Sequence, residues 1–308
     1  MSRNRRVATV VVGLVFVASF VVVLQSRLLG SAATTTSTGT PTTLPARSTY
    51  LYLDIGASVS VGFQPTPRDP TGQPTNRGYS DRLVKIEAAR GVTLKLTELG
   101  CPGESIAMMI HGPDPCYVMP DTQLSDAVAF LRAHHDAATL VSVDLGFNTL
   151  NACFHHYDID PSCVTPKLAL LRSQLRQVMS VLTKAAGPHV VFVGLGHYNP
   201  YLTKSTKEGA AELFATNSVA AMHKMNRTLA QVYGSFKVPM AGVATAFHEE
   251  DLRVVRISKK ESTTANVQYE CRLTWMCSPK PYGPNLHPND AGYQVIAQAI
   301  AAVLPSGF

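Results

Sequence analysis

Net charge is nearly absent from most of this 308-residue chain. The whole sequence carries 27 Lys and Arg against 21 Asp and Glu, but five of the arginines and none of the acids lie in residues 1–48. The remainder therefore holds 22 basic and 21 acidic residues. Such a balance produces no field that would follow a phosphate backbone, so we do not expect nucleic acid as a partner.

Short cysteine motifs are missing as well. No CxxC occurs, which argues against a zinc or redox site built on the six cysteines. The cysteines fit an oxidising compartment, and three local loops are the simplest of their many possible pairings. The predicted disulfides are Cys101–Cys116, Cys153–Cys163 and Cys271–Cys277.

The segment from Val7 to Leu24 contains no charge at all and follows three arginines. It is longer than the apolar core of most signal peptides and close to the length that spans a bilayer. We predict a cytoplasmic N-terminus at 1–6 and a transmembrane signal-anchor at 7–24, with a cleaved signal peptide as the alternative. Residues 25–48, rich in Thr and Pro, indicate an extended linker, and 49–308 the folded domain. Either route exports that domain, to be anchored at the cell membrane or secreted.

Clean alternation of apolar and polar residues is missing from the five apolar, β-branched runs of this domain. Such runs are typical of strands that helices cover on both faces. They are Tyr50–Gly56, Val92–Leu99, Thr139–Gly146, His189–Gly196 and Phe236–Ala244. Helical patterns lie between or after them, at Ser80–Arg90, Gln123–His134, Leu168–Leu182, Glu208–Tyr233 and Tyr293–Val303. This order predicts one doubly wound α/β domain with a parallel sheet between layers of helices.

Sites in such a fold lie at the carboxyl ends of the strands. Four segments follow predicted strands there, at 56–58, 100–105, 146–150 and 196–201. Ser58 ends the first strand, although Ser60 occupies the place of the last glycine in a Gly-x-Ser-x-Gly elbow. A serine nucleophile needs a base, and His287, in NLHPNDAGY before the final helix, could face it from the far end of the sequence.

Four blocks occur in one order along the chain: Ser58 in a Gly-x-Ser turn, Gly103 in LGCPGES, Asn148 in LGFNTL and His287 in LHPNDAGY. Together they resemble the SGNH hydrolases, the esterases and lipases also called GDSL hydrolases, from about residue 50 to residue 304. The resemblance implies a three-layer α/β/α sandwich with a flavodoxin-like five-stranded sheet, and ester hydrolysis through an acyl-enzyme without metal or cofactor. It implies Ser58 as nucleophile and His287 as base. It also implies an oxyanion hole made by the backbone N–H groups of Ser58 and Gly103 and the Asn148 amide.

Two acids of the family pattern are missing. Ala57 stands where the first block has an aspartate that supports the turn. Pro284 stands three residues before His287, in the place of the triad acid, and the next residue, Asn285, is not acidic either. A backbone carbonyl can set the imidazole tautomer without a charge, so we predict that the Pro284 carbonyl orients the ring and that the enzyme is slower than a full triad. Asp290 opens the last helix and is predicted to cap it.

Other features carry weaker predictions. CFHHYDID at 153–160 offers two histidines and two aspartates, but adjacent histidines point apart, so we predict a polar loop rather than a metal site. Trp275, the only tryptophan, could wall the acyl site or pack under its own loop.

The substrate and reaction stay partly open at this stage. We expect a small-molecule, lipid or glycan ester, chosen by the loops at 63–77 and 151–166. An acyltransferase would use the same residues, and a non-catalytic surface binding module could keep the fold. We expect a monomer that meets the membrane only through its N-terminal segment.

Overall fold

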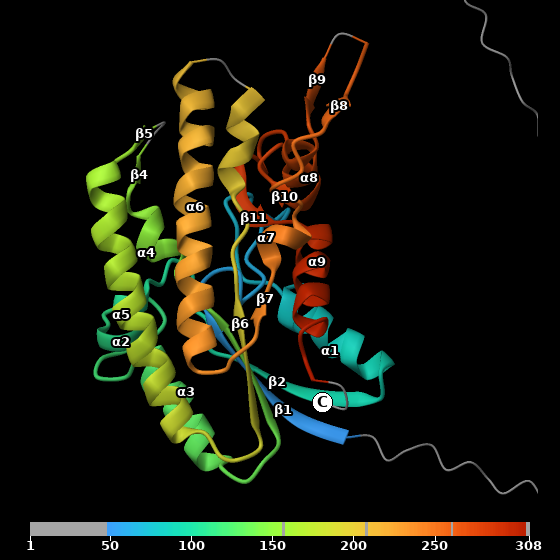
Figure 1. Ribbon diagram of the computed structural model, residues 1–308. Coiled ribbons are helices and arrows are strands. Elements are labelled where there is room, and N and C mark those ends of the chain that lie inside the picture. Colours follow the sequence, from blue (N-terminus) through green and yellow to red (C-terminus); the bar gives the residue numbers. More distant parts are fainter. Residues whose placement is uncertain (1–47, 156–157, 207–208, 260, 306–308) are drawn as a thin grey trace, which may run out of the picture. The chain divides into compact units, whose positions relative to one another are not determined.

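A five-stranded parallel sheet forms the centre of the fold (Figure 1). The computed structural model describes residues 48–155, 158–206, 209–259 and 261–305. The strands run in the order β2–β1–β3–β6–β7, the flavodoxin-like order. They are β1 (Ser48–Gly56), β2 (Val92–Glu98), β3 (Thr139–Asp144), β6 (Val190–Leu195) and β7 (Met240–Ala241). From β1 the chain continues to β2 on one side, and then adds β3, β6 and β7 on the other side. A crevice is expected at the carboxyl ends of β1 and β3, where this change of side occurs.

Helices cover both faces of this sheet (Figure 1). On one face lie α2 (Ile106–His111), α3 (Gln123–Ala133), α5 (Pro161–Ala185) and α6 (Ala210–Ser235). On the other lie α1 (Tyr79–Ala89) and α9 (Asp290–Ala301). Successive strand residues point to opposite faces, so Leu53 and Ile55 enter the first core while Tyr52 enters the second. The predicted three-layer α/β/α sandwich is confirmed.

The last strand is shorter than the run Phe236–Ala244 predicts, because only Met240 and Ala241 pair with β6. Phe236 caps the end of α6, and Lys237 has a φ of 58°, which bends the chain away from an extended path. Pro239 has no N–H to donate, although its carbonyl accepts a hydrogen bond from Gly194. The apolar run therefore forms mainly a turn, in which Val238 is buried while Lys237 and Pro239 are exposed.

Short elements surround the carboxyl ends of the strands. They are α4 (Phe147–Asn151), β4 (Phe154–His155), β5 (Asp158–Ile159), η1 (Pro200–Thr206), α7 (Val243–Ala246), β8 (Val254–Arg256), β9 (Ser262–Thr264), α8 (Ala265–Leu273), β10 (Thr274–Trp275) and β11 (Asn285–Pro288). Three disulfides join these connections, in the three pairings that the sequence predicts.

The predicted N-terminal segments, at 1–6, 7–24 and 25–48, lie outside the described residues except for Ser48, which begins β1. Among the helices that the structure describes, none combines the length and the apolar character needed to cross a membrane.

Candidate active site

Ser58 lies in the tight turn that follows β1. Gly56, two residues before Ser58, forms two hydrogen bonds with the side-chain amide of Gln123. The Gly56 N–H donates to Oε1 over 2.8 Å, and Nε2 donates to the Gly56 carbonyl over 2.9 Å. The Ser60 hydroxyl donates to the Ala57 carbonyl over 2.7 Å and closes the turn. These bonds hold the strand end and the serine turn in place without the aspartate of the family pattern.

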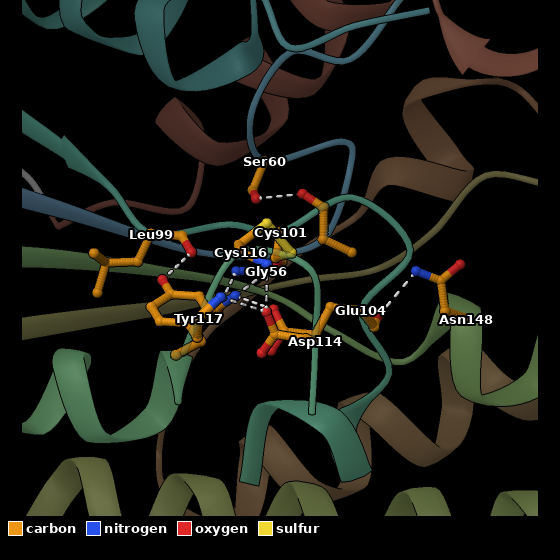
Figure 2. Close-up of a disulfide and its surroundings, with 11 residues drawn as sticks. Gly56, Ser60, Leu99, Cys101, Glu104, Asp114, Cys116, Tyr117 and Asn148 are labelled. Carbon is orange, nitrogen blue, oxygen red and sulfur yellow. Dashed lines mark hydrogen bonds between the residues drawn. A yellow bond between two sulfur atoms is a disulfide. The ribbon is translucent and has the colours of Figure 1, made fainter. Parts of the chain in front are cut away.

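The loop after β2 brings Gly103 to the same pocket as Ser58. Gly103 has a φ of +84°, a left-handed conformation that glycine adopts without strain. The Cys101–Cys116 disulfide ties this loop to a neighbouring segment, and Cys101 N–H donates to the Gly56 carbonyl over 3.1 Å (Figure 2). The loop is thereby attached to the end of β1.

Asn148 lies in α4, directly after β3. Its side-chain Nδ2 donates to the Glu104 carbonyl over 2.9 Å, which leaves the second hydrogen of that amide for another acceptor (Figure 2). This bond connects α4 to the loop that carries Gly103, and both Asn148 and Gly103 line one pocket together with Ser58.

His287 comes from β11, which pairs antiparallel with β10 beside the sheet. Its Nε2 lies 2.9 Å from Ser58 Oγ, although 229 positions separate the two residues in the chain. The Phe63 ring packs against the imidazole at a centroid distance of 4.6 Å. This is the geometry in which a histidine can take a proton from a serine hydroxyl.

The other ring nitrogen of His287 is held by Asn285. Nδ1 lies 2.7 Å from Asn285 Oδ1, while Asn285 Nδ2 donates to the Thr71 carbonyl over 2.9 Å. Because Nδ2 is committed to a carbonyl, Oδ1 must face the ring, so Nδ1 carries the proton and Nε2 is free to accept from Ser58. The prediction that the Pro284 carbonyl orients the ring is therefore wrong, since Asn285 already occupies Nδ1.

A pocket of about 330 Å³ opens beside this pair. Its lining includes all four residues of the predicted site, Ser58, Gly103, Asn148 and His287. Apolar side chains, among them Phe147 and Leu286, form much of the remaining wall.

The comparisons with known proteins concern the fold. No family model matches the sequence, and no curated protein matches it. Two solved structures that resemble the fold are a phospholipase A1 from Streptomyces albidoflavus NA297 and an extracellular lipase from Streptomyces rimosus. They share 16% and 17% of residues with this chain, each comparison covers 82% of this chain and 99% of the other, and both TM-scores are 0.50. The chain has the SGNH hydrolase fold.

Within this SGNH hydrolase fold, desolvation lowers the pKa of His287 to about 4. The ring is therefore neutral, and able to act as a base, at neutral pH. Burial has the opposite effect on Glu104, whose pKa it raises to about 8. The Glu104 carboxyl accepts a hydrogen bond from Gln123 Nε2, so one buried network joins the loop that carries Gly103 to the serine turn. Nothing in the sequence around Gln123 singled it out.

Some predicted residues lie away from the site. Trp275 packs beside Tyr282 and is not among the described residues that line the pocket. Asn289, rather than Asp290, caps α9, because its side chain accepts from two backbone N–H groups. Asp290 instead forms ion pairs with Arg77, just before α1, and with Arg82 of α1.

The histidine and aspartate segment at 153–160 is divided among several elements. His155 and Asp158 lie opposite each other in the β4–β5 hairpin, and Asp160 caps α5. His156 lies outside the described residues.

Proposed function

We propose that the protein is an extracytoplasmic serine esterase that hydrolyses carboxylic esters through an acyl-enzyme. The observation that carries the proposal is the 2.9 Å contact between Ser58 Oγ and His287 Nε2 at the edge of a pocket. The three disulfides support export, because such bonds persist in oxidising compartments.

In the first half-reaction, Ser58 Oγ attacks the ester carbonyl carbon while His287 Nε2 accepts the hydroxyl proton. The carbonyl oxygen gains negative charge, which the N–H groups of Ser58 and Gly103 and the Asn148 amide would stabilise. The tetrahedral intermediate collapses, and His287 gives the proton to the leaving alcohol. Water then repeats the sequence on the acyl-enzyme and releases the acid.

Asn285 supplies orientation but no negative charge. It holds the tautomer of His287 that can accept from Ser58, which is one function of the triad acid. It does not stabilise the imidazolium that forms during the attack. We therefore expect slower turnover than a complete triad would give.

The proposal is tested by covalent labelling of the full-length protein with its disulfides formed. A fluorophosphonate should add one adduct per chain, read by intact mass. The adduct should disappear in Ser58→Ala and form much more slowly in His287→Ala. Ser60→Ala, which removes the neighbouring hydroxyl, should still be labelled. A folded, oxidised protein that takes no adduct would contradict the proposal and favour a binding module.

A further inference from the structure

Asp144 ends β3 and lines the same pocket as Ser58. Only 4% of this residue is exposed. Among the described residues, none donates a hydrogen bond to either of its carboxyl oxygens. The polar group beside the carboxyl is Nδ1 of His197, at the distance of an ion pair from Oδ1. A buried carboxyl group normally has hydrogen-bond partners, because its desolvation is costly. An acceptor without a donor, at the wall of a pocket, indicates a place for a ligand group.

His197, from the segment after β6, lies beside Asp144 and lines the same pocket. Its Nε2 lies 3.1 Å from the Leu145 carbonyl, which can only accept, so Nε2 carries a hydrogen. Its Nδ1 lies 3.6 Å from Asp144 Oδ1. A proton on Nδ1 or on the Asp144 carboxyl would join these two atoms directly, so the pair can satisfy itself. The other carboxyl oxygen, Oδ2, then remains as an acceptor for a hydrogen-bond donor in the pocket.

The backbone of His197 is held firmly in this position. Its N–H donates to Asn226 Oδ1 over 2.8 Å, and its carbonyl accepts from Asn226 Nδ2 over 2.8 Å. His197 is therefore anchored to α6 through Asn226, and neither Ser58 nor His287 forms a hydrogen bond with it.

We propose that Asp144 and His197 form a polar subsite that binds a hydroxyl group of the substrate near its ester bond. The inference rests on the proposed esterase function and names its substrate class: short esters of hydroxy acids or polyols. The pocket volume of about 330 Å³ agrees with a short ester, because it lies at the lower end of the range of about 300–1,000 Å³ for small-molecule sites.

Two matched pairs of esters test this subsite. Methyl 3-hydroxybutyrate against methyl butyrate places the hydroxyl in the acyl part, and glyceryl monobutyrate against propyl butyrate places it in the alcohol part. Each ester is measured by kcat/KM and by its protection of Ser58 from fluorophosphonate. In at least one pair we expect a preference of about 10- to 100-fold for the hydroxylated ester.

Substitutions at Asp144 should change that preference. Asp144→Leu should bring the ratio of the pair close to one, while Asp144→Asn, which keeps an acceptor oxygen, should retain part of it. Asp54→Asn is the matched control: Asp54 is a buried acid of β1 that already accepts from Tyr79 and Ser142, and its variant should keep the ratio.

The outcomes separate the two proposals. Wild-type protein that is labelled at Ser58 but shows no hydroxyl preference in turnover or in protection overturns the subsite alone. A preference that survives in Asp144→Leu also overturns it. Protein that takes no label at Ser58 overturns the esterase function, and the subsite falls with it.

Discussion

The replacement of Asn285 by aspartate probes how this site works with a neutral partner for its histidine. In the wild-type protein, His287 Nδ1 donates to Asn285 Oδ1 over 2.7 Å, and desolvation lowers the pKa of His287 to about 4. Asn285→Asp keeps an acceptor at that distance and adds a negative charge. It also loses the bond from Nδ2 to the Thr71 carbonyl.

The size of the effect follows from the charge separation. A carboxylate and an imidazolium in such contact have charge centres about 4 Å apart, and at an effective dielectric constant of about 20 they attract by about 4 kcal/mol. At about 1.4 kcal/mol per pKa unit this corresponds to roughly three units. The lost bond to Thr71 costs about 1 kcal/mol of folding free energy in both protonation states of His287 and does not enter its pKa. We therefore expect the pKa of His287 to rise by about two units or more.

The assay is kcat/KM for a short ester between about pH 3.5 and 9. A histidine with a lowered pKa is neutral above that pKa, so wild-type activity should fall only as the pH approaches about 4. In Asn285→Asp the acid limb should move up by about two pH units, and the plateau above it should rise roughly tenfold or more, because the charge stabilises the imidazolium.

Asn285→Ala completes the series. It removes the acceptor without adding a charge, so kcat/KM should fall on the order of 100-fold while the acid limb shows no upward shift. If Asn285→Asp leaves the acid limb in its wild-type position, or if Asn285→Ala keeps wild-type activity, Asn285 does not orient His287 and the reasoning is refuted.

Three further predictions concern the surroundings of the site. Asn148→Ala should lower kcat about 10²- to 10³-fold with little change in KM, since an oxyanion donor acts mainly in the transition state; an unchanged kcat would remove Asn148 from the oxyanion hole. Replacing Cys101 and Cys116 together by serine opens a 15-residue loop and should lower the free energy of unfolding by about 3 kcal/mol, measured by urea titration. Labelling of Ser58 should also become slower. An unaffected labelling rate would show that the disulfide does not hold the loop that carries Gly103. Gly194→Ala places a Cβ 2.4 Å from the Tyr233 ring and should destabilise the fold by about 1–3 kcal/mol, and an unchanged melting temperature would contradict that packing.

Features that depend on neighbours in the chain were predictable from the sequence. Four of the five strands and the stripe of α5 follow from apolar patterns, because burial on two faces or on one leaves a periodic trace. The disulfides join cysteines only 6 to 15 positions apart, so local pairing was the simplest expectation. The predicted length of the fifth strand was wrong, because apolar content alone does not reveal that the turn at Lys237 and Pro239 leaves only two residues paired.

Residue types and their order are sufficient to predict a parallel α/β sandwich, an unusual serine at the end of its first strand and a histidine before its last helix. They do not reveal the partner of that histidine. The Asn285 amide is fixed from both sides, because its Nδ2 donates to the carbonyl of Thr71, 214 positions away, and its Oδ1 accepts from the His287 backbone N–H. Gln123 supports the serine turn because it meets Gly56, 67 positions away. The unpartnered acceptor of Asp144 likewise results from packing around β3. Such roles depend on contacts between distant segments, and these contacts leave no pattern in the chain that could be read before it folds.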